Sequence, residues 1–167
     1  MVIRRERVED REAIRHVHRV AFGGSAEATL VDRLRDDGLV VVSLAAVEDH
    51  HVVGHILFSR LPIHTSTVVI PAVALAPLGV IAGRQRQGIG SALVRKGLQE
   101  CRAAGERIAI VLGHPEYYPR FGFSSALASR LRSPFSGRSF MALELESAAL
   151  AGVSGEVRYP PAFDLAS

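Results

Sequence analysis

The sequence contains one cysteine, one lysine and no tryptophan among its 167 residues. A single cysteine excludes an intramolecular disulfide. Cys101 falls on the apolar side of an expected helix, where a packing role is favoured over a nucleophilic one. No apolar run approaches the ~20 residues that cross a bilayer, and the first residues lack the apolar core of a secretion signal. We therefore expect a cytoplasmic protein with no membrane partner.

The charge is almost balanced, although the isoelectric point suggests otherwise. Nineteen arginines and Lys96 stand against 17 acidic residues, so the formal net charge is +3 while the pI is 9.6. Arginine keeps its proton throughout the accessible pH range, so a small positive excess persists and raises the pI. The arginines form neither a cluster nor a stripe interleaved with aromatic residues. Nucleic acid is therefore not an expected partner.

The chain is long enough for one domain with a substantial core. Hydrophobic residues make up 48% of it, which excludes disorder. Apolar periodicity and turn residues predict helices over 9–22, 27–37 and 91–105, the last of these ending at Gly105. Strands are predicted over 2–7, 39–47, 52–59, 68–81 (interrupted at Ala76-Pro77), 107–113 and 140–146. Segments 124–138 and 147–167 show no clear periodic element, apart from a possible strand in the first.

The histidines form no metal-binding pattern. His50 and His51 are sequence neighbours in the expected turn between strands 39–47 and 52–59, so their side chains diverge, and no zinc spacing occurs elsewhere. No metal is expected. His55 is different because it falls inside an apolar strand. It is either a hydrogen-bonded core or edge histidine, or a substrate-pocket or proton-relay residue.

A glycine turn joins the strand ending at Ile81 to the helix 91–105. The stretch 85–91 reads Gln-Arg-Gln-Gly-Ile-Gly-Ser. A P-loop is excluded because Ile89 and Gly90 stand where lysine and a hydroxyl residue belong, and a dinucleotide fingerprint fails at Leu93. A glycine-rich turn at a helix N-terminus nevertheless presents free backbone N–H groups to a phosphate. Arg84 and Arg86 add positive charge beside the turn.

The turn fits a third pattern, Gln/Arg-x-x-Gly-x-Gly/Ala, on Gln85, Gly88 and Gly90. A second motif follows the apolar run 107–113, where Tyr118, Gly122 and Phe123 form Tyr-x-x-x-Gly-Phe. Together the two motifs resemble the GNAT superfamily of N-acetyltransferases. The similarity is closer to a bacterial branch of predicted N-acetyltransferases, through segments 54–59, 76–80 and 117–123. It extends over nearly the whole chain.

The resemblance implies one GNAT domain over 1–167, a mixed α/β fold with a mostly antiparallel central sheet, a splayed parallel strand pair and flanking helices. It implies acetyl-CoA as cosubstrate, with pantetheine lying in the gap between the splayed strands. The phosphate turn and the bulged strand before it would hold the cofactor. The residues expected to bind it are Leu78, Gly79, Val80, Gln85, Arg86, Gln87, Gly88, Ile89, Gly90 and Ser91.

The resemblance assigns the protonation of the departing CoA thiolate to Tyr118, while the adjacent Tyr117 is expected to point elsewhere. A tyrosine hydroxyl is a proton donor at neutral pH, with a reference pKa of ~10. Residues 22–27 should border the acceptor pocket. A general base must also accept a proton from the amine, and no motif identifies it. The candidates are Glu27, His55, His114 and Glu116.

Three functions remain open at this point. The main hypothesis is an N-acetyltransferase that acts directly on a primary amine. A non-catalytic acyl-CoA sensor or interaction module is the alternative, and a nucleotide-phosphate-binding protein is the third. The acceptor is equally open between a small metabolite amine, an aminoglycoside-like polyamine and a protein N-terminus. Members of the superfamily are often dimers, so a homodimer is also conceivable.

Overall fold

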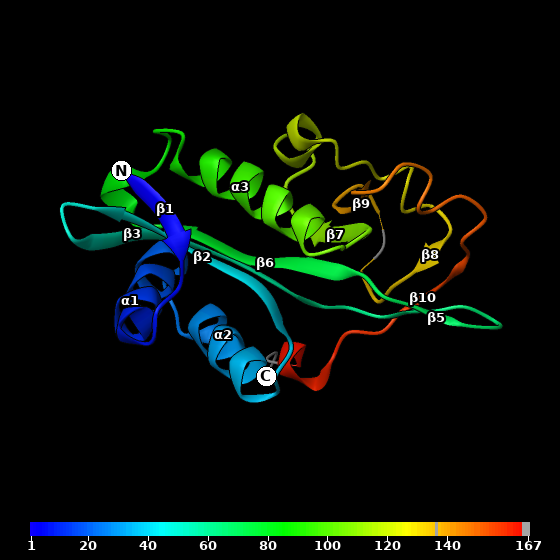
Figure 1. The fold of residues 1–167 in the computed structure, drawn as a ribbon, viewed down its shortest axis with the longest axis horizontal. Coiled ribbons are helices and arrows are strands. Elements are labelled where there is room, and N and C mark those ends of the chain that lie inside the picture. The colour runs from blue at the N-terminus through cyan, green and yellow to red at the C-terminus, as the bar shows by residue number, and fades with distance from the viewer. Residues whose placement is uncertain (136, 165–167) are drawn as a thin grey trace.

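The computed structural model describes residues 1–135 and 137–164. Its centre is a six-stranded sheet in the order β1-β2-β3-β6-β7-β9 (Figure 1). All neighbouring strands are antiparallel except the parallel pair β6 and β7. The predicted mixed α/β fold is confirmed. The strands are β1 Val2–Arg5, β2 Val40–Glu48, β3 His51–Arg60, β6 Val73–Val80, β7 Ile108–Leu112 and β9 Phe140–Glu144.

Helices cover both faces of this sheet. α1 (Arg11–Phe22) and α2 (Ala26–Asp36) pack on one face, and α3 (Ile89–Ala103) packs on the other (Figure 1). α1 buries Ile14 and Val17 and ends at Gly23, whose φ of 76° is the left-handed conformation that glycine adopts without strain. Short 3-10 helices complete the elements: Val8–Asp10, Ala82–Arg84, Tyr118–Phe121 and Pro161–Phe163.

α3 lies unusually close to the sheet. A Cβ built on Gly97, in the middle of α3, would stand 2.3 Å from the ring of Phe58 on β3. Phe58 is fully buried, together with Leu93 and Cys101 from α3. Glycine therefore sits inside the helix, despite its poor helix propensity, because the phenylalanine ring occupies the space of a side chain. The predicted packing role of Cys101 is confirmed, and burial raises the pKa of its thiol to about 12.

The single strand predicted over 68–81 is wrong, since the structure divides it between two sheets. Val69–Ile70 forms β5, and β6 begins at Val73 after Pro71, which has no N–H to donate to a ladder. β5 belongs to a second sheet in the order β5-β4-β10-β8 at the far end of the molecule (Figure 1). Its other strands are Ile63–His64 (β4), Leu131–Arg132 (β8) and Gly155–Val157 (β10). β4 and β5 pair locally, but β10 joins β4 and β8 across long sequence separations, so no local pattern predicted this sheet.

The parallel strands β6 and β7 separate along their length. Within the described chain they pair at Val73 with Ala109 and at Ala74 with Ile110, and at no later position. The register of β6 against β3 also shifts around Pro77. The predicted irregularity at Ala76-Pro77 and the splayed strand pair are both confirmed. Residues 136 and 165–167 belong to the two segments without predicted elements, and they lie outside the described residues.

Candidate active site

A cavity of about 640 Å³ lies where β6 and β7 diverge. Leu78, Gly79 and Val80 form one wall, as expected for residues that face a bound cofactor. Gly113 and Tyr118, which follow β7, lie opposite. The same cavity reaches the phosphate turn at Gln85, Arg86 and Gly90, and it reaches α1 and α2 at Phe22 and Glu27. One continuous space thus connects the turn, the open strand edge and the expected acceptor side.

The phosphate turn has the geometry expected from its glycines. Gly88 precedes α3 with a φ of 84°, and Arg86 also has a positive φ, of 63°. α3 begins at Ile89, so the N–H groups of its first turn have no hydrogen-bond partner within the helix and are free to bind a ligand. Ile89 itself is buried in the core and offers only its backbone, while Ser91 lines a second hollow beside the turn.

The side chains of two glutamines in the turn make hydrogen bonds within the loop. The Gln85 side chain donates to the Val80 carbonyl at 2.9 Å and so ties the turn to the end of β6. The Gln87 side chain donates to the Gly83 carbonyl at 3.4 Å. Both residues were predicted to contact the cofactor. Their side chains also shape the turn that offers the backbone N–H groups.

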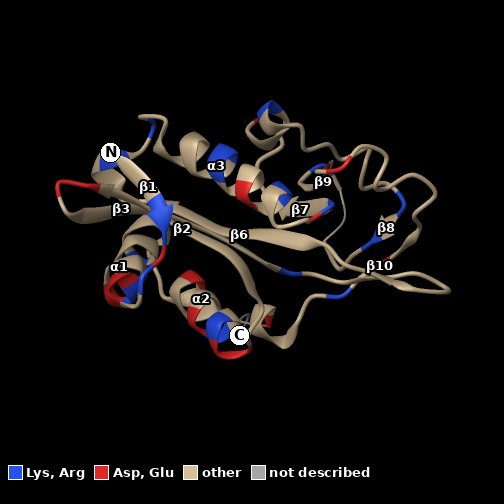
Figure 2. Ribbon diagram, viewed as in Figure 1, with Lys and Arg blue, Asp and Glu red and all other residues tan. Residues whose placement is uncertain are grey.

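The positive charge at the turn differs from the expectation. Arg84 pairs with Glu48, the last residue of β2, and Figure 2 shows acidic residues at the tip of the β2–β3 hairpin. Its charge is therefore largely neutralised. Arg120 adds a further positive charge: its guanidinium lies 4.5 Å from the ring centre of Tyr117, and it lines the same hollow as Arg84 and Arg86. Arg120 was missed, since it is far from the turn in sequence.

Tyr118 of the second motif and the adjacent Tyr117 both face the cavity. Tyr118 is 8% exposed, and burial, with the neighbouring Tyr117, raises its pKa to about 12. Its hydroxyl therefore remains protonated at neutral pH. The expectation that Tyr117 points elsewhere is wrong, because its hydroxyl lies 2.9 Å from Ser91 Oγ and its ring lines the cavity. The 3-10 turn over Tyr118–Phe121 brings both rings to one side, which adjacent positions on a strand would not do.

The candidates for the general base differ in whether their side chains line the cavity. Glu27 and His114 line the cavity, whereas Glu116 is exposed and is 3.9 Å from Arg138. Glu27 is half-buried in the first turn of α2 and is the only carboxylate that the described residues contribute to the cavity wall. In the part of the chain that the structure describes, it has no ion-pair partner. His55 is fully buried and lies behind the wall.

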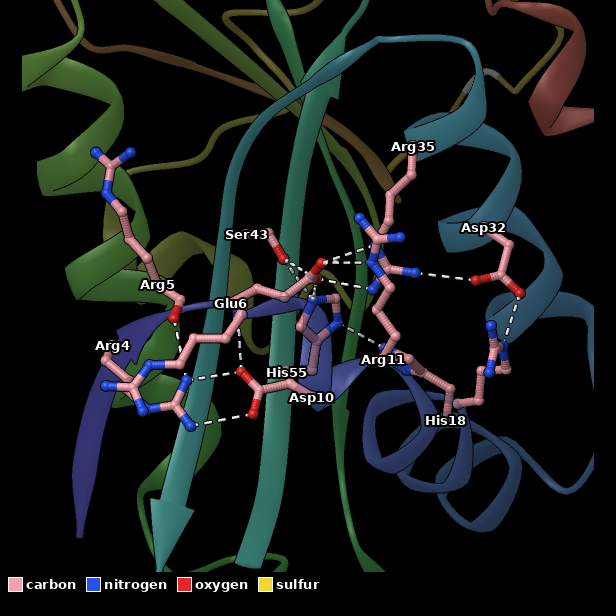
Figure 3. A network of polar contacts seen from close by, with 12 residues as sticks. Arg4, Arg5, Glu6, Asp10, Arg11, His18, Asp32, Arg35, Ser43 and His55 are labelled. Carbon is pink, nitrogen blue, oxygen red and sulfur yellow. Dashed lines mark hydrogen bonds and ion pairs between the residues drawn. The ribbon is translucent and has the colours of Figure 1, made fainter.

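His55 belongs to a buried polar chain that the sequence did not reveal (Figure 3). Its ring lies 2.8 Å from His18 Nε2 and 2.8 Å from Ser43 Oγ. His18 on α1 is fully buried as well and had not been singled out. The available signal was its position one turn after Ile14, on the apolar side of the helix.

Residues 1–135 and 137–164 lack two features typical of other functions. No three His, Cys, Asp or Glu side chains gather there as a metal ligand set. Nor is any helix in those ranges both long and apolar enough to cross a bilayer.

Comparison with known proteins agrees with this geometry. Residues 2–126 match the family model of the acetyltransferase (GNAT) domain. The uncharacterized N-acetyltransferase YhbS of Escherichia coli K12 is 35% identical over 167 residues, covering 98% of this chain and 99% of the relative. The crystal structure of E. coli YhbS in complex with CoA superimposes with a TM-score of 0.89 and 36% identity, over 98% and 91% of the two chains.

A GNAT family acetyltransferase from Brucella melitensis, solved in complex with acetyl-CoA, gives a TM-score of 0.82 at 35% identity. The superposition covers 98% of this chain and 97% of that one. The fold and the splayed-strand cavity define an acyltransferase of this architecture. The chain belongs to the GNAT acetyltransferase family, as its two motifs predicted.

Proposed function

We propose that this protein is an acetyl-CoA-dependent N-acetyltransferase, with residues 1–167 as a single catalytic domain. The observation that carries the proposal is the continuous cavity that runs from the glycine turn, past the open edge of β6, to Tyr118 and Glu27. A module that only binds acyl-CoA needs the glycine turn and the open edge of β6, but neither Tyr118 nor Glu27. Relatives solved with CoA and with acetyl-CoA support the choice of donor.

The donor is held at two places. Backbone N–H groups of 86–91 bind the pyrophosphate at the positive end of α3, and Arg86 and Arg120 add charge. The pantetheine arm lies along β6 at Leu78, Gly79 and Val80, where β7 no longer pairs with it. An extended ligand can pair with such an open strand edge as another strand would.

The reaction forms a C–N bond and breaks a C–S bond. The neutral amine attacks the thioester carbonyl, and a backbone N–H near Val80 donates to the developing oxyanion. The intermediate then expels the CoA thiolate, which takes a proton from the Tyr118 hydroxyl in the same cavity, and the proton that the nitrogen loses on forming the amide restores that hydroxyl through water. Because burial holds the pKa of Tyr118 at about 12, this proton is available at every physiological pH.

The acceptor is a primary amine that arrives as a cation. An ammonium group has a pKa of ~10 for a lysine-like amine and must lose a proton before it attacks. Glu27 attracts this cation and accepts the proton directly or through water, because no other carboxylate among the described residues lines the cavity. Apolar residues, among them Phe22, Leu30 and Pro77, flank it and favour an acceptor with an aliphatic stem. We place the reaction in the cytoplasm, with no nucleic acid as partner.

A thermal melt with acetyl-CoA, CoA, NAD and ATP tests the donor. Ligand at ~100 times its Kd stabilises a protein by about 2.7 kcal/mol, which is roughly 5–10 °C in Tm at this size. We expect the shift with CoA and acetyl-CoA alone. Release of free thiol from acetyl-CoA in the presence of a panel of primary amines then separates an enzyme from a sensor. A sensor would show the shift without thiol release.

A further inference from the structure

A chain of four buried or half-buried side chains runs from the first loop to the cavity wall (Figure 3). Arg35 donates twice to Glu6, at 2.8 Å each. Ser43 Oγ donates to Glu6 Oε1 at 2.6 Å and lies 2.8 Å from His55 Nε2. His55 Nδ1 in turn lies 2.8 Å from His18 Nε2. The last atom of the chain, His18 Nδ1, has no partner among the described residues.

The position of the Ser43 hydroxyl proton determines which atom donates in each hydrogen bond of the chain. The ionised Glu6 only accepts, so the single hydroxyl proton of Ser43 goes to it. His55 Nε2 must then be the donor to Ser43 Oγ. Burial lowers the pKa of His55, so its other nitrogen is bare and accepts from His18 Nε2–H. A neutral His18 in this tautomer presents a lone pair at Nδ1.

This lone pair lies directly behind the cavity wall. A Cβ built on Gly79 would be 2.7 Å from His18 Nδ1 and 3.5 Å from Phe22 Cε2. Gly79 and Phe22 both line the cavity, and Phe22 is 47% exposed at the last residue of α1. Three groups thus meet at one point: a glycine without a side chain, an exposed aromatic ring and a ring nitrogen without a hydrogen-bond partner among the described residues. Any other residue at 79 would fill that point.

The chain is not a proton relay. Burial, with His55 and Arg35 nearby, lowers the pKa of His18 to about 3. Burial alone would raise the pKa of Glu6, but hydrogen bonds with His55, Arg35 and Ser43 lower it. These shifts hold both histidines neutral and Glu6 ionised, so the chain carries no proton to pass along. The buried network instead keeps His18 neutral and its lone pair oriented, and aligned hydrogen bonds polarise one another in such a network.

We propose that His18 is an acceptor-binding residue of the transferase, and that its Nδ1 accepts a hydrogen bond from the amine N–H as the nitrogen attacks. Phe22 turns away from Gly79 to admit the amine, and the attacking nitrogen gains positive charge beside the lone pair. Glu6, Ser43 and His55 are positioning residues that hold His18 in the required tautomer. The proposal rests on the proposed function and adds a second contact to the acceptor besides Glu27.

The variant His18→Gln tests the lone pair while retaining the chain, because the glutamine amide can still donate to His55 Nδ1. The matched control is His16→Gln on the exposed side of the same helix. With n-propylamine as acceptor, we expect kcat/KM for the amine to fall roughly tenfold to a hundredfold in His18→Gln, the effect of losing a hydrogen bond to a charging group. The control should match the wild type, and the Kd of acetyl-CoA should be unchanged in both.

Ring ¹⁵N resonances of the unliganded protein test the tautomer without any turnover. We expect a bare Nδ1 and a protonated Nε2 on His18, and a shift of the Nδ1 resonance when n-propylamine is added with CoA. A protonated Nδ1, or a folded His18→Gln protein with wild-type kcat/KM, would overturn the inference while leaving the transferase intact. A wild-type protein that binds no acetyl-CoA would refute the proposed function instead, whatever the tautomer of His18.

Discussion

Gly113 controls the position of the proposed acid, so we expect Gly113→Ala to abolish most activity through Tyr118. A Cβ at this position would stand 2.3 Å from Tyr118 Cε2, whereas ordinary contacts are 3.4–4 Å. The ring must therefore move by about 1 Å or more. A misplacement of ~1 Å at a reacting group costs roughly 100-fold in rate. The backbone of Gly113 is not left-handed, so alanine adds no backbone strain and the loss is steric.

A double-mutant cycle identifies the route of this loss. Tyr118→Phe alone should lower kcat by about 10²–10⁴-fold, the usual contribution of a general acid. If Gly113→Ala acts by displacing the hydroxyl, the double variant should be no worse than Tyr118→Phe alone. The assay is thiol release from acetyl-CoA at saturating amine, with the Kd of acetyl-CoA measured separately. Unchanged kcat in Gly113→Ala, or effects that multiply in the double variant, would refute the reasoning.

Three further outcomes follow from the structure. Burial lowers the pKa of His18 from 6.5 to about 3, so below pH 6.5 the unfolded chain binds a proton that the folded chain does not. The free energy of unfolding should therefore fall by about 3 kcal/mol between pH 6.5 and 4. Denaturant titrations should show a shallower fall in His18→Gln. Gly97→Ala should destabilise the folded protein by about 1–3 kcal/mol despite the better helix propensity of alanine, because its Cβ would meet Phe58 at 2.3 Å. The control is Gly24→Ala, whose Cβ would meet nothing within 4 Å. Equal Tm values in the two variants would contradict the close packing of α3. Glu27→Gln should raise KM for cationic amines about tenfold, the loss of one charge-assisted contact, without changing the Kd of acetyl-CoA; an unchanged KM would remove Glu27 from the acceptor site.

Local sequence patterns predicted the parts of this protein whose geometry depends on neighbouring residues. The glycine turn at 85–91 and the helix after it follow from backbone freedom at Gly88 and from helical periodicity. The Tyr-x-x-x-Gly-Phe motif indicated the position of Tyr118, and the hairpin of β2 and β3 was visible as two apolar runs around an exposed turn. Together they were sufficient to predict the family, which the comparisons confirm.

Only the tertiary structure decided the contacts made across long sequence separations. Glu48 neutralises Arg84, Arg120 joins the phosphate turn by stacking on Tyr117, and β4, β5, β8 and β10 assemble a second sheet. His18 and His55 meet because α1 packs over β3, and the missing side chain of Gly79 leaves room for them. Helix and strand periodicity depends on residues one to four positions apart, so it predicts which side chains turn inward. It carries no information about which inward side chains meet, because that depends on how the packed layers come together.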